Sequence, residues 1–173
     1  ALAAPRQAGT RQGFPAPSSI QSLAPQSAGK DRPMSASSPG EVRIIGGRWK
    51  RTPLPVADRP GLRPTPGRVR ETLFNWLGQD MTGKVCLDLF AGSGALGFEA
   101  ASRGARHVVL VERDSRAFHA LEATRSGLSA SQVELVRADG LAFLESDTRS
   151  YDVVFLDPPY RLGLLPRVLP KLT

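Results

Sequence analysis

Short apolar runs alternate with helix-patterned segments from residue 84 onward, and this alternation constrains the fold more than any other feature of the chain. The four runs occupy residues 85–90, 107–111, 133–137 and 151–156, and the helical patterns between them occupy residues 95–103, 115–126 and 141–145. Alternating strands and helices predict a mostly parallel sheet covered on both faces, so we expect an α/β fold. Ligands bind such sheets beyond the carboxyl ends of the strands, where each run here meets a polar or glycine-rich signal.

The first run leads into a glycine-rich turn. Gly92, Gly94 and Gly97 match the pattern G-x-G-x-x-G, which is compatible with NAD or with S-adenosylmethionine (SAM). Asp88 precedes the glycines, and a carboxylate there would repel a pyrophosphate but suits the charged amino-acid portion of SAM. Glu112 ends the second run, where a carboxylate can accept both hydroxyls of a ribose. The turn therefore predicts a nucleoside ligand, with SAM favoured.

Two further strand ends carry candidate site residues. Asp139 follows the third run and can accept a hydrogen bond from an adenine amine, or cap the next helix. Asp157-Pro158-Pro159-Tyr160 follows the fourth run, and consecutive prolines fix the backbone and remove two donors. Asp157 and the Pro158 carbonyl can then accept from an exocyclic amine, and Tyr160 can stack on a flipped base. This motif predicts methylation of a base amine.

The formal net charge of +7 lies towards the N-terminus, because residues 41–70 carry +6, residues 1–40 carry +3 and residues 71–173 carry −2. A basic arm on a near-neutral domain favours a polyanionic partner over a merely solvated surface. Residues 1–40 are mostly Ala, Pro, Ser, Gly and Gln and are predicted to be a disordered tail, with Met34 as the natural start.

Residues 42–56 are expected to form a hairpin or extended arm that turns at Gly46-Gly47. A Pro-rich loop over 57–65 precedes a helix over 66–77, with Thr65 as N-cap and Pro66 in the first helical position. The helical spacing of four apolar side chains predicts that they face the core. These are Val69, Leu73, Trp76 and Leu77.

The strings DLFAGSGALGFEA, VERD, RADG and FLDPPY resemble those of class I SAM-dependent methyltransferases that modify exocyclic amines of bases. The leading strings RIIGGRWKR and LRPTPGRVRETLFNWL are more specific, and they resemble the bacterial 16S rRNA guanine-N2 methyltransferase family (RsmD-type). Two departures stand out. Gly67 replaces an acidic residue often seen in that family, and the chain ends soon after FLDPPY, where the class continues with further strands. A truncated and weakly stable chain is therefore expected.

This resemblance implies a domain over 41–173, made of a basic RNA-binding arm and helix (41–78) and a Rossmann-like core (84–173) that lacks its C-terminal strands. It implies a catalytic set of Asp157, Pro158 and Tyr160. It implies a SAM-binding set of Asp88, Phe90, Ala91, Gly92, Gly94, Glu112, Arg113, Ala138 and Asp139. It implies an RNA-binding set of Arg43, Arg48, Trp49, Lys50, Arg51, Arg63, Arg68 and Arg70. For Trp49, packing against the domain is the equal alternative to stacking on RNA.

The implied reaction is transfer of a methyl group from SAM to a guanine amine in 16S rRNA or the small ribosomal subunit, by a cytoplasmic monomer without metal or membrane. The single cysteine, Cys86, fits a reducing compartment and a core position. Three other functions remain open. They are a DNA adenine-N6 methyltransferase with the same motif, an NAD(P) oxidoreductase that would leave Asp157-Pro158-Pro159-Tyr160 unexplained, and a catalytically impaired RNA-binding fragment.

Overall fold

The computed structural model describes residues 41–56, 65–159 and 163–172. Several predictions fall outside these residues: the disordered tail over 1–40, the start at Met34, the loop over 57–64, and the roles of Arg63 and Tyr160. Within the described residues, no helix is long and apolar enough to cross a membrane.

The predicted parallel sheet is present. Its four strands are β3 (Val85–Asp88), β4 (His107–Val111), β5 (Val133–Val136) and β6 (Val153–Phe155), in the order β5-β4-β3-β6. All neighbouring pairs run parallel, and Asp88 is in register with Leu110 of β4 and with Phe155 of β6. The α/β prediction is therefore confirmed. The first strand of the core, β3, is an inner strand, with β4 on one side of it and β6 on the other.

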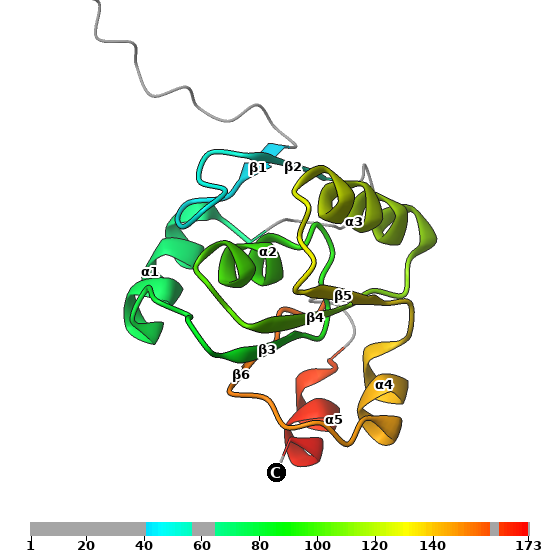
Figure 1. The fold of residues 1–173 in the computed structure, drawn as a ribbon. Helices are drawn as coiled ribbons and strands as arrows, with labels where there is room; N and C mark the ends of the chain where they lie inside the picture. The colour runs from blue at the N-terminus through cyan, green and yellow to red at the C-terminus, as the bar shows by residue number, and fades with distance from the viewer. Residues whose placement is uncertain (1–40, 57–64, 160–162, 173) are drawn as a thin grey trace, which may run out of the picture. The chain divides into compact units, whose positions relative to one another are not determined.

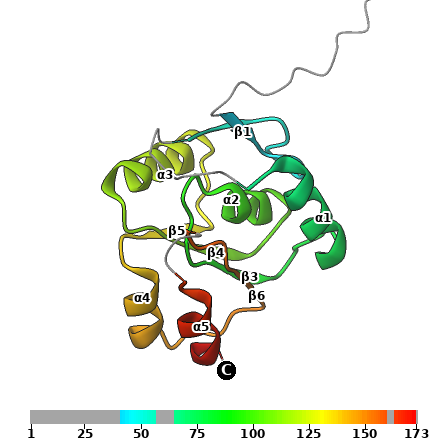
Figure 2. The same ribbon diagram turned by 180° about the vertical axis from the view of Figure 1, so that it is seen from behind.

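Helices cover both faces of the sheet (Figures 1 and 2). Helices α1 (Gly67–Leu77), α2 (Ala95–Ser102) and α3 (Ser115–Gly127) lie on one face, and α4 (Gly140–Ser146) and α5 (Leu165–Val168) lie on the other. A 3₁₀ turn over Leu169–Lys171 follows α5. Side chains of each strand alternate between two buried clusters: Cys86 faces the first helices, whereas Leu87 faces the second. Burial on both faces explains why the strands read as continuous apolar runs.

The predicted hairpin is also confirmed. Strand β1 (Glu41–Arg43) pairs antiparallel with β2 (Pro53–Pro55), and residues 44–52 connect them. In this loop Gly47 has φ +73°, and a Cβ added there would lie 1.9 Å from the backbone oxygen of Ser102 in α2. The glycine signal therefore marks a close approach of the loop to α2 as well as a change of chain direction.

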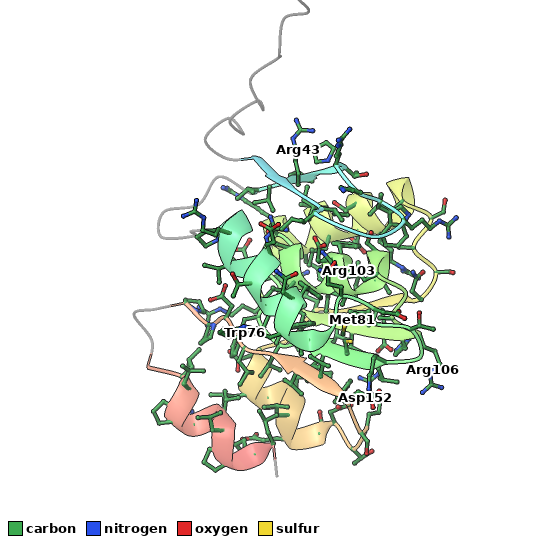
Figure 3. All side chains as sticks on the ribbon, turned by 90° about the vertical axis from the view of Figure 1, so that its left-hand side faces the viewer. Arg43, Trp76, Met81, Arg103, Arg106 and Asp152 are labelled. Atoms are coloured by element: carbon green, nitrogen blue, oxygen red, sulfur yellow. The ribbon has the colours of Figure 1, made fainter. Side chains whose placement is uncertain are left out.

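Helix α1 corrects two predictions. Its N-cap is Pro66 and no side chain caps it, so Thr65 is not the cap. The helix also presents a different face to the core. Phe74 is fully buried and packs on Phe155 with ring centroids 5.8 Å apart. Trp76, by contrast, is 83% exposed (Figure 3). Val69 and Leu77 are also exposed, and Leu73 is half-buried.

Candidate functional site

The carboxyl ends of the strands meet at one edge of the sheet, as the sequence predicts. The backbone N–H of Leu89 donates to the carbonyl of Phe155 at 3.2 Å, and that of Ala91 donates to Val111 at 2.9 Å. The N–H of Glu112 donates to Val136 at 3.0 Å. These bonds continue the ladder past the strands, so the segments that follow β3, β4, β5 and β6 begin side by side.

Glu112 fixes the glycine-rich turn. Its Oε2 accepts a hydrogen bond from the N–H of Gly92 at 2.9 Å, and its Oε1 accepts from the N–H of Asp114 at 2.8 Å. The side chain is nearly buried, since Glu112 is only 9% exposed. The predicted nucleoside-binding carboxylate is therefore held in place by two backbone donors, and each oxygen keeps one lone pair for a further donor.

Asp88 lies beneath the same turn. It is 1% exposed, and its Oδ2 accepts from the N–H of Gly97 in α2 at 3.0 Å. Burial, together with the negative charges of Asp157 and Glu112, raises the pKa of Asp88 to about 7. The carboxylates of Asp157 and Glu112 therefore lie close enough to disfavour the ionised form of Asp88. This corner suits a cationic ligand and opposes a pyrophosphate.

Close packing requires Gly94. It has φ +75°, and a Cβ added there would lie 2.6 Å from Phe98 Cδ2 and 2.7 Å from Leu121 Cδ2. Both neighbours belong to the buried core, so neither can move without cost. The first turn of α2 is thus pressed against α3. At Gly94, the glycine of the G-x-G-x-x-G pattern is therefore required because the backbone packs closely against these two side chains.

Asp139 caps helix α4, which is the structural alternative that the sequence left open. Its Oδ1 accepts from the N–H groups of Leu141 and Ala142. Its Oδ2 lies 3.7 Å from the Arg113 guanidinium, and both side chains are half-exposed. The loops after β4 and β5 are therefore linked across the edge by two of the predicted SAM-binding residues.

Phe90, Ala91 and Ala138 also lie along this edge. A Cβ added at Gly140 would lie 2.9 Å from the ring of Phe90, so the segment after β3 contacts the start of α4. Ala91 is buried, and Phe90 and Ala138 are half-buried. The predicted SAM-binding residues thus gather at the ends of β3, β4 and β5.

Asp157 is exposed, and Pro158 is half-buried. The hydroxyl of Thr65 donates a hydrogen bond to Asp157 Oδ2, which brings the segment before α1 to the end of β6. Sequence reasoning missed this contact because threonine before proline is a typical helix-capping signal. The predicted catalytic motif therefore has a neighbour from a distant part of the chain.

Five of the predicted RNA-binding side chains are exposed. They are Arg43, Arg48, Lys50, Arg51 and Arg68. Two others are corrected. Trp49 is 8% exposed and packs in the first core cluster, so it is not placed to stack on RNA. Arg70 is 3% exposed and points inward, so it does not offer its charge to a phosphate.

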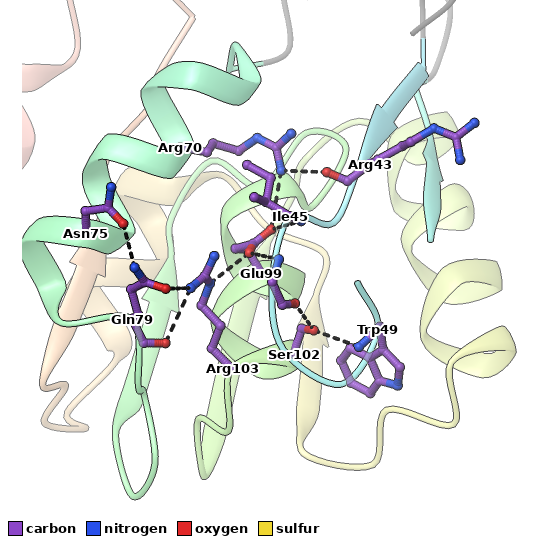
Figure 4. Close-up of polar contacts among 10 residues, drawn as sticks. Arg43, Ile45, Trp49, Arg70, Asn75, Gln79, Glu99, Ser102 and Arg103 are labelled. Atoms are coloured by element: carbon purple, nitrogen blue, oxygen red, sulfur yellow. Dashed lines mark hydrogen bonds and ion pairs between the residues drawn. The ribbon is translucent and has the colours of Figure 1, made fainter. Parts of the chain in front are cut away.

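A buried carboxylate holds the basic hairpin and was missed by sequence reasoning. Glu99 of α2 is fully buried, and it accepts from the N–H groups of Ile45 at 2.7 Å and Gly46 at 2.8 Å (Figure 4). Arg103 Nε donates to it at 2.8 Å, and an Arg70 nitrogen lies 3.5 Å away. The glutamate in the apolar string of α2 was the available signal, since a buried acid requires partners.

A hollow of about 580 Å³ lies away from this edge. It is lined by the hairpin loop, the second half of α1 and the end of α2, and it includes Lys50, Asn75 and Gln79. None of the four strand-end carboxylates lines it. Among the described residues, no group of three or more His, Cys, Asp or Glu side chains is arranged to hold a metal ion.

The buried Asp88 predicts a pH-dependent stability. The unfolded chain releases this proton near pH 3.8, whereas the folded chain holds it up to about pH 7. Folding therefore binds a proton between these values, and rising pH should lower the free energy of unfolding. The effect should reach a few kcal/mol, because one pKa unit corresponds to about 1.4 kcal/mol.

Urea unfolding of the wild type and of Asp88→Asn at a series of pH values measures this effect. The asparagine oxygen can still accept from Gly97, but it does not titrate. The wild type should lose stability relative to the variant as the pH rises from about 4 to about 7. Glu122→Gln, a change at an exposed carboxylate of α3, is the control. A constant difference between wild type and Asp88→Asn across this range would contradict the prediction.

Residues 42–173 match the family described as Conserved hypothetical protein 95. The chain is 48% identical over 129 residues to the Ribosomal RNA small subunit methyltransferase D of Escherichia coli K12, covering 75% of this chain and 65% of that protein. The protein of the same name from Haemophilus influenzae is 47% identical over 129 residues, covering 72% of this chain and 67% of its own length.

A solved structure of a candidate methyltransferase from Escherichia coli shares the fold, with a TM-score of 0.69 and 46% identity. The match covers 77% of this chain and 73% of that one. A hypothetical protein from Thermus thermophilus gives a TM-score of 0.66 at 33% identity, covering 75% and 78% of the two chains. The chain thus spans about two thirds of the length of the curated relatives it matches.

Proposed function

The chain belongs to the Conserved hypothetical protein 95 family, the RsmD-type family that its motifs resemble, and on this premise we propose that it transfers a methyl group from SAM to the N2 amine of a guanine in small-subunit ribosomal RNA. One observation carries the proposal. Glu112 and Asp157 lie at a single sheet edge, close to the buried Asp88, where their carboxylates suit a cationic cofactor and an amine donor.

The chemistry of this edge fits SAM better than NAD. The neighbouring carboxylates of Glu112 and Asp157 favour a ligand with a sulfonium and an ammonium group, whereas a pyrophosphate would meet their repulsion. The N–H of Gly92, which a dinucleotide site would offer to a phosphate, is donated to Glu112. Glu112 would hold the ribose hydroxyls, and Asp139 would accept from the adenine amine. SAM supplies an activated methyl group on a positively charged sulfur when bound.

Asp157 and Pro158 would hold the base. The Asp157 carboxylate is exposed at the end of β6, where it can accept a hydrogen bond from an exocyclic N–H. Acceptance from the amine localises the nitrogen lone pair, which is otherwise delocalised into the ring. The rigid Pro158 carbonyl would accept the second N–H, and Tyr160 would stack on the extruded base. Positioning and electrostatics are then the protein's main contributions.

The exposed basic side chains of the hairpin and α1 would bind the RNA backbone. Arg48, Lys50 and Arg51 lie on the loop that α2 holds in place, and Arg68 lies in the first half of α1. Each cation that meets a phosphate adds to affinity and to its dependence on salt. The names of the relatives support ribosomal RNA of the small subunit as the substrate, and we propose a cytoplasmic monomer without metal.

The proposal is tested by incubating the purified chain with radiolabelled SAM and with small ribosomal subunits that lack the modification. Digestion of the RNA and chromatography of its nucleosides should recover the label as N2-methylguanosine. Duplex DNA is included as an alternative substrate. Recovery of the label as N6-methyladenine from DNA would identify adenine in DNA, and not guanine in ribosomal RNA, as the substrate. Binding of SAM and RNA without any transfer would show an RNA-binding fragment that lacks turnover.

A further inference from the structure

The contact between Thr65 and Asp157 joins residues that are 92 positions apart in the sequence. Thr65 precedes α1, is half-buried and donates its hydroxyl proton to Asp157 Oδ2. We propose that Thr65 is a positioning residue, which fixes the Asp157 carboxylate for the amine of the substrate base. This inference rests on the proposed function, because it assigns to Asp157 the role of amine acceptor.

An exposed carboxylate otherwise turns freely about its last two torsions. A hydroxyl that donates to Oδ2 restricts this rotation and leaves Oδ1 available to accept from a substrate N–H. Hydrogen bonds to ionised acceptors are the stronger class, so one donor suffices to orient the group. Orientation of the acceptor governs how well the amine lone pair is aimed, and therefore affects turnover more than binding.

Thr65 is itself held by a buried arginine. Arg70 Nε donates to the Thr65 carbonyl at 3.3 Å. Its Nη1 donates to the Arg43 carbonyl at 3.0 Å (Figure 4). Nη1 also lies 3.5 Å from Glu99 Oε2 in α2. A single guanidinium thus braces the segment before α1, strand β1 and α2. Burial of this charge is compensated by Glu99, so Thr65 is anchored to the core.

The arrangement explains why Arg70 points inward although its neighbours in the sequence are exposed. Arg70 would connect the basic hairpin to Asp157 through Thr65, with no side chain of its own in the site. A lysine at this position has three donors on one nitrogen and lacks the planar fork that reaches two carbonyls. Arg70→Lys is therefore expected to loosen Thr65 while leaving a positive charge beside Glu99.

Three variants separate positioning from other roles. Thr65→Val has the same shape and no donor, Thr65→Ser keeps the hydroxyl, and Thr72→Val makes the same change at a position inside α1. Thr72 is exposed and donates to the Arg68 carbonyl at 3.0 Å, so it has only a local role. Steady-state kcat and the KM for small subunits are measured for each, together with the Kd for SAM by calorimetry.

Thr65→Val should lower kcat about ten- to a hundredfold, as a misplaced catalytic group does. Its KM and SAM affinity should match those of the wild type, Thr65→Ser should recover most of the turnover, and Thr72→Val should be unaffected. An unchanged kcat in Thr65→Val, or a raised KM alone, would overturn the inference while the wild type remains active. Absence of methyl transfer by the wild type would instead refute the proposed function, and the inference with it.

Discussion

Replacement of Asp157 by alanine is expected to lower methyl transfer to small subunits about a thousandfold, the usual cost of losing one oriented group in a reaction centre. Asp157 is an exposed carboxylate at the end of β6, and alanine leaves the substrate amine without its acceptor. Turnover at saturating SAM and RNA, followed by incorporation of labelled methyl groups, measures the loss. The KM for RNA should change little, because the basic hairpin remains intact.

Asp152→Ala is the matched control for this prediction. Asp152 is an exposed aspartate that directly precedes β6, at the opposite edge of the sheet (Figure 3). It accepts from the N–H of Val85 at 2.7 Å, so its loss should cost some stability and no turnover. Equal turnover of Asp157→Ala and the wild type, with Asp152→Ala also unaffected, would remove Asp157 from the mechanism.

The second large effect is on stability. Glu99→Ala should lower the free energy of unfolding by about 3–5 kcal/mol, because it leaves buried charges without their partner. Burial lowers the pKa of Arg70 while the charge of Glu99 opposes that shift. The variant also leaves the N–H groups of Ile45 and Gly46 without their acceptor. Urea unfolding followed by circular dichroism measures the change.

Glu122→Ala on α3 is the control for Glu99. Its carboxylate lies 2.9 Å from His119, and both side chains are mostly exposed, so the pair should contribute less than about 1 kcal/mol. Glu99→Gln keeps one acceptor oxygen and should fall between the two. If Glu99→Ala costs no more than Glu122→Ala, the buried network does not hold the hairpin, and the hairpin must be attached by its apolar contacts alone.

The sheet and its functional edge could be predicted because their signals are local. Each apolar run reports a strand that is buried on both faces, and the polar residue after it reports the strand end. Parallel pairing then brings Asp88, Glu112, Asp139 and Asp157 to the same edge, whatever the side chains between them. The hairpin could be predicted for the same reason, because its glycines mark the connecting loop.

Helix α1 shows where local signals fail. The four apolar side chains that were expected to face the core share one face of the helix, yet the structure buries Phe74 and Arg70 instead. The buried arginine has its counter-charge on α2 and its carbonyl partners at residues 43 and 65, so no window of the sequence contains the reason for its burial. The same separation hid the contact of Thr65 with Asp157. Hydrogen bonds and ion pairs between residues distant in the sequence therefore determine the features of α1 that the spacing of apolar residues could not predict.

Calorimetric titration of SAM tests most directly whether Glu112 binds the cofactor while Asp157 binds the base. The wild type should bind one equivalent, Glu112→Ala should lose this binding with its folding preserved, and Asp157→Ala should retain it. That result would place the cofactor at the end of β4 and reserve the end of β6 for the base. A folded wild type that does not bind SAM, or an equal loss in both variants, would contradict the account.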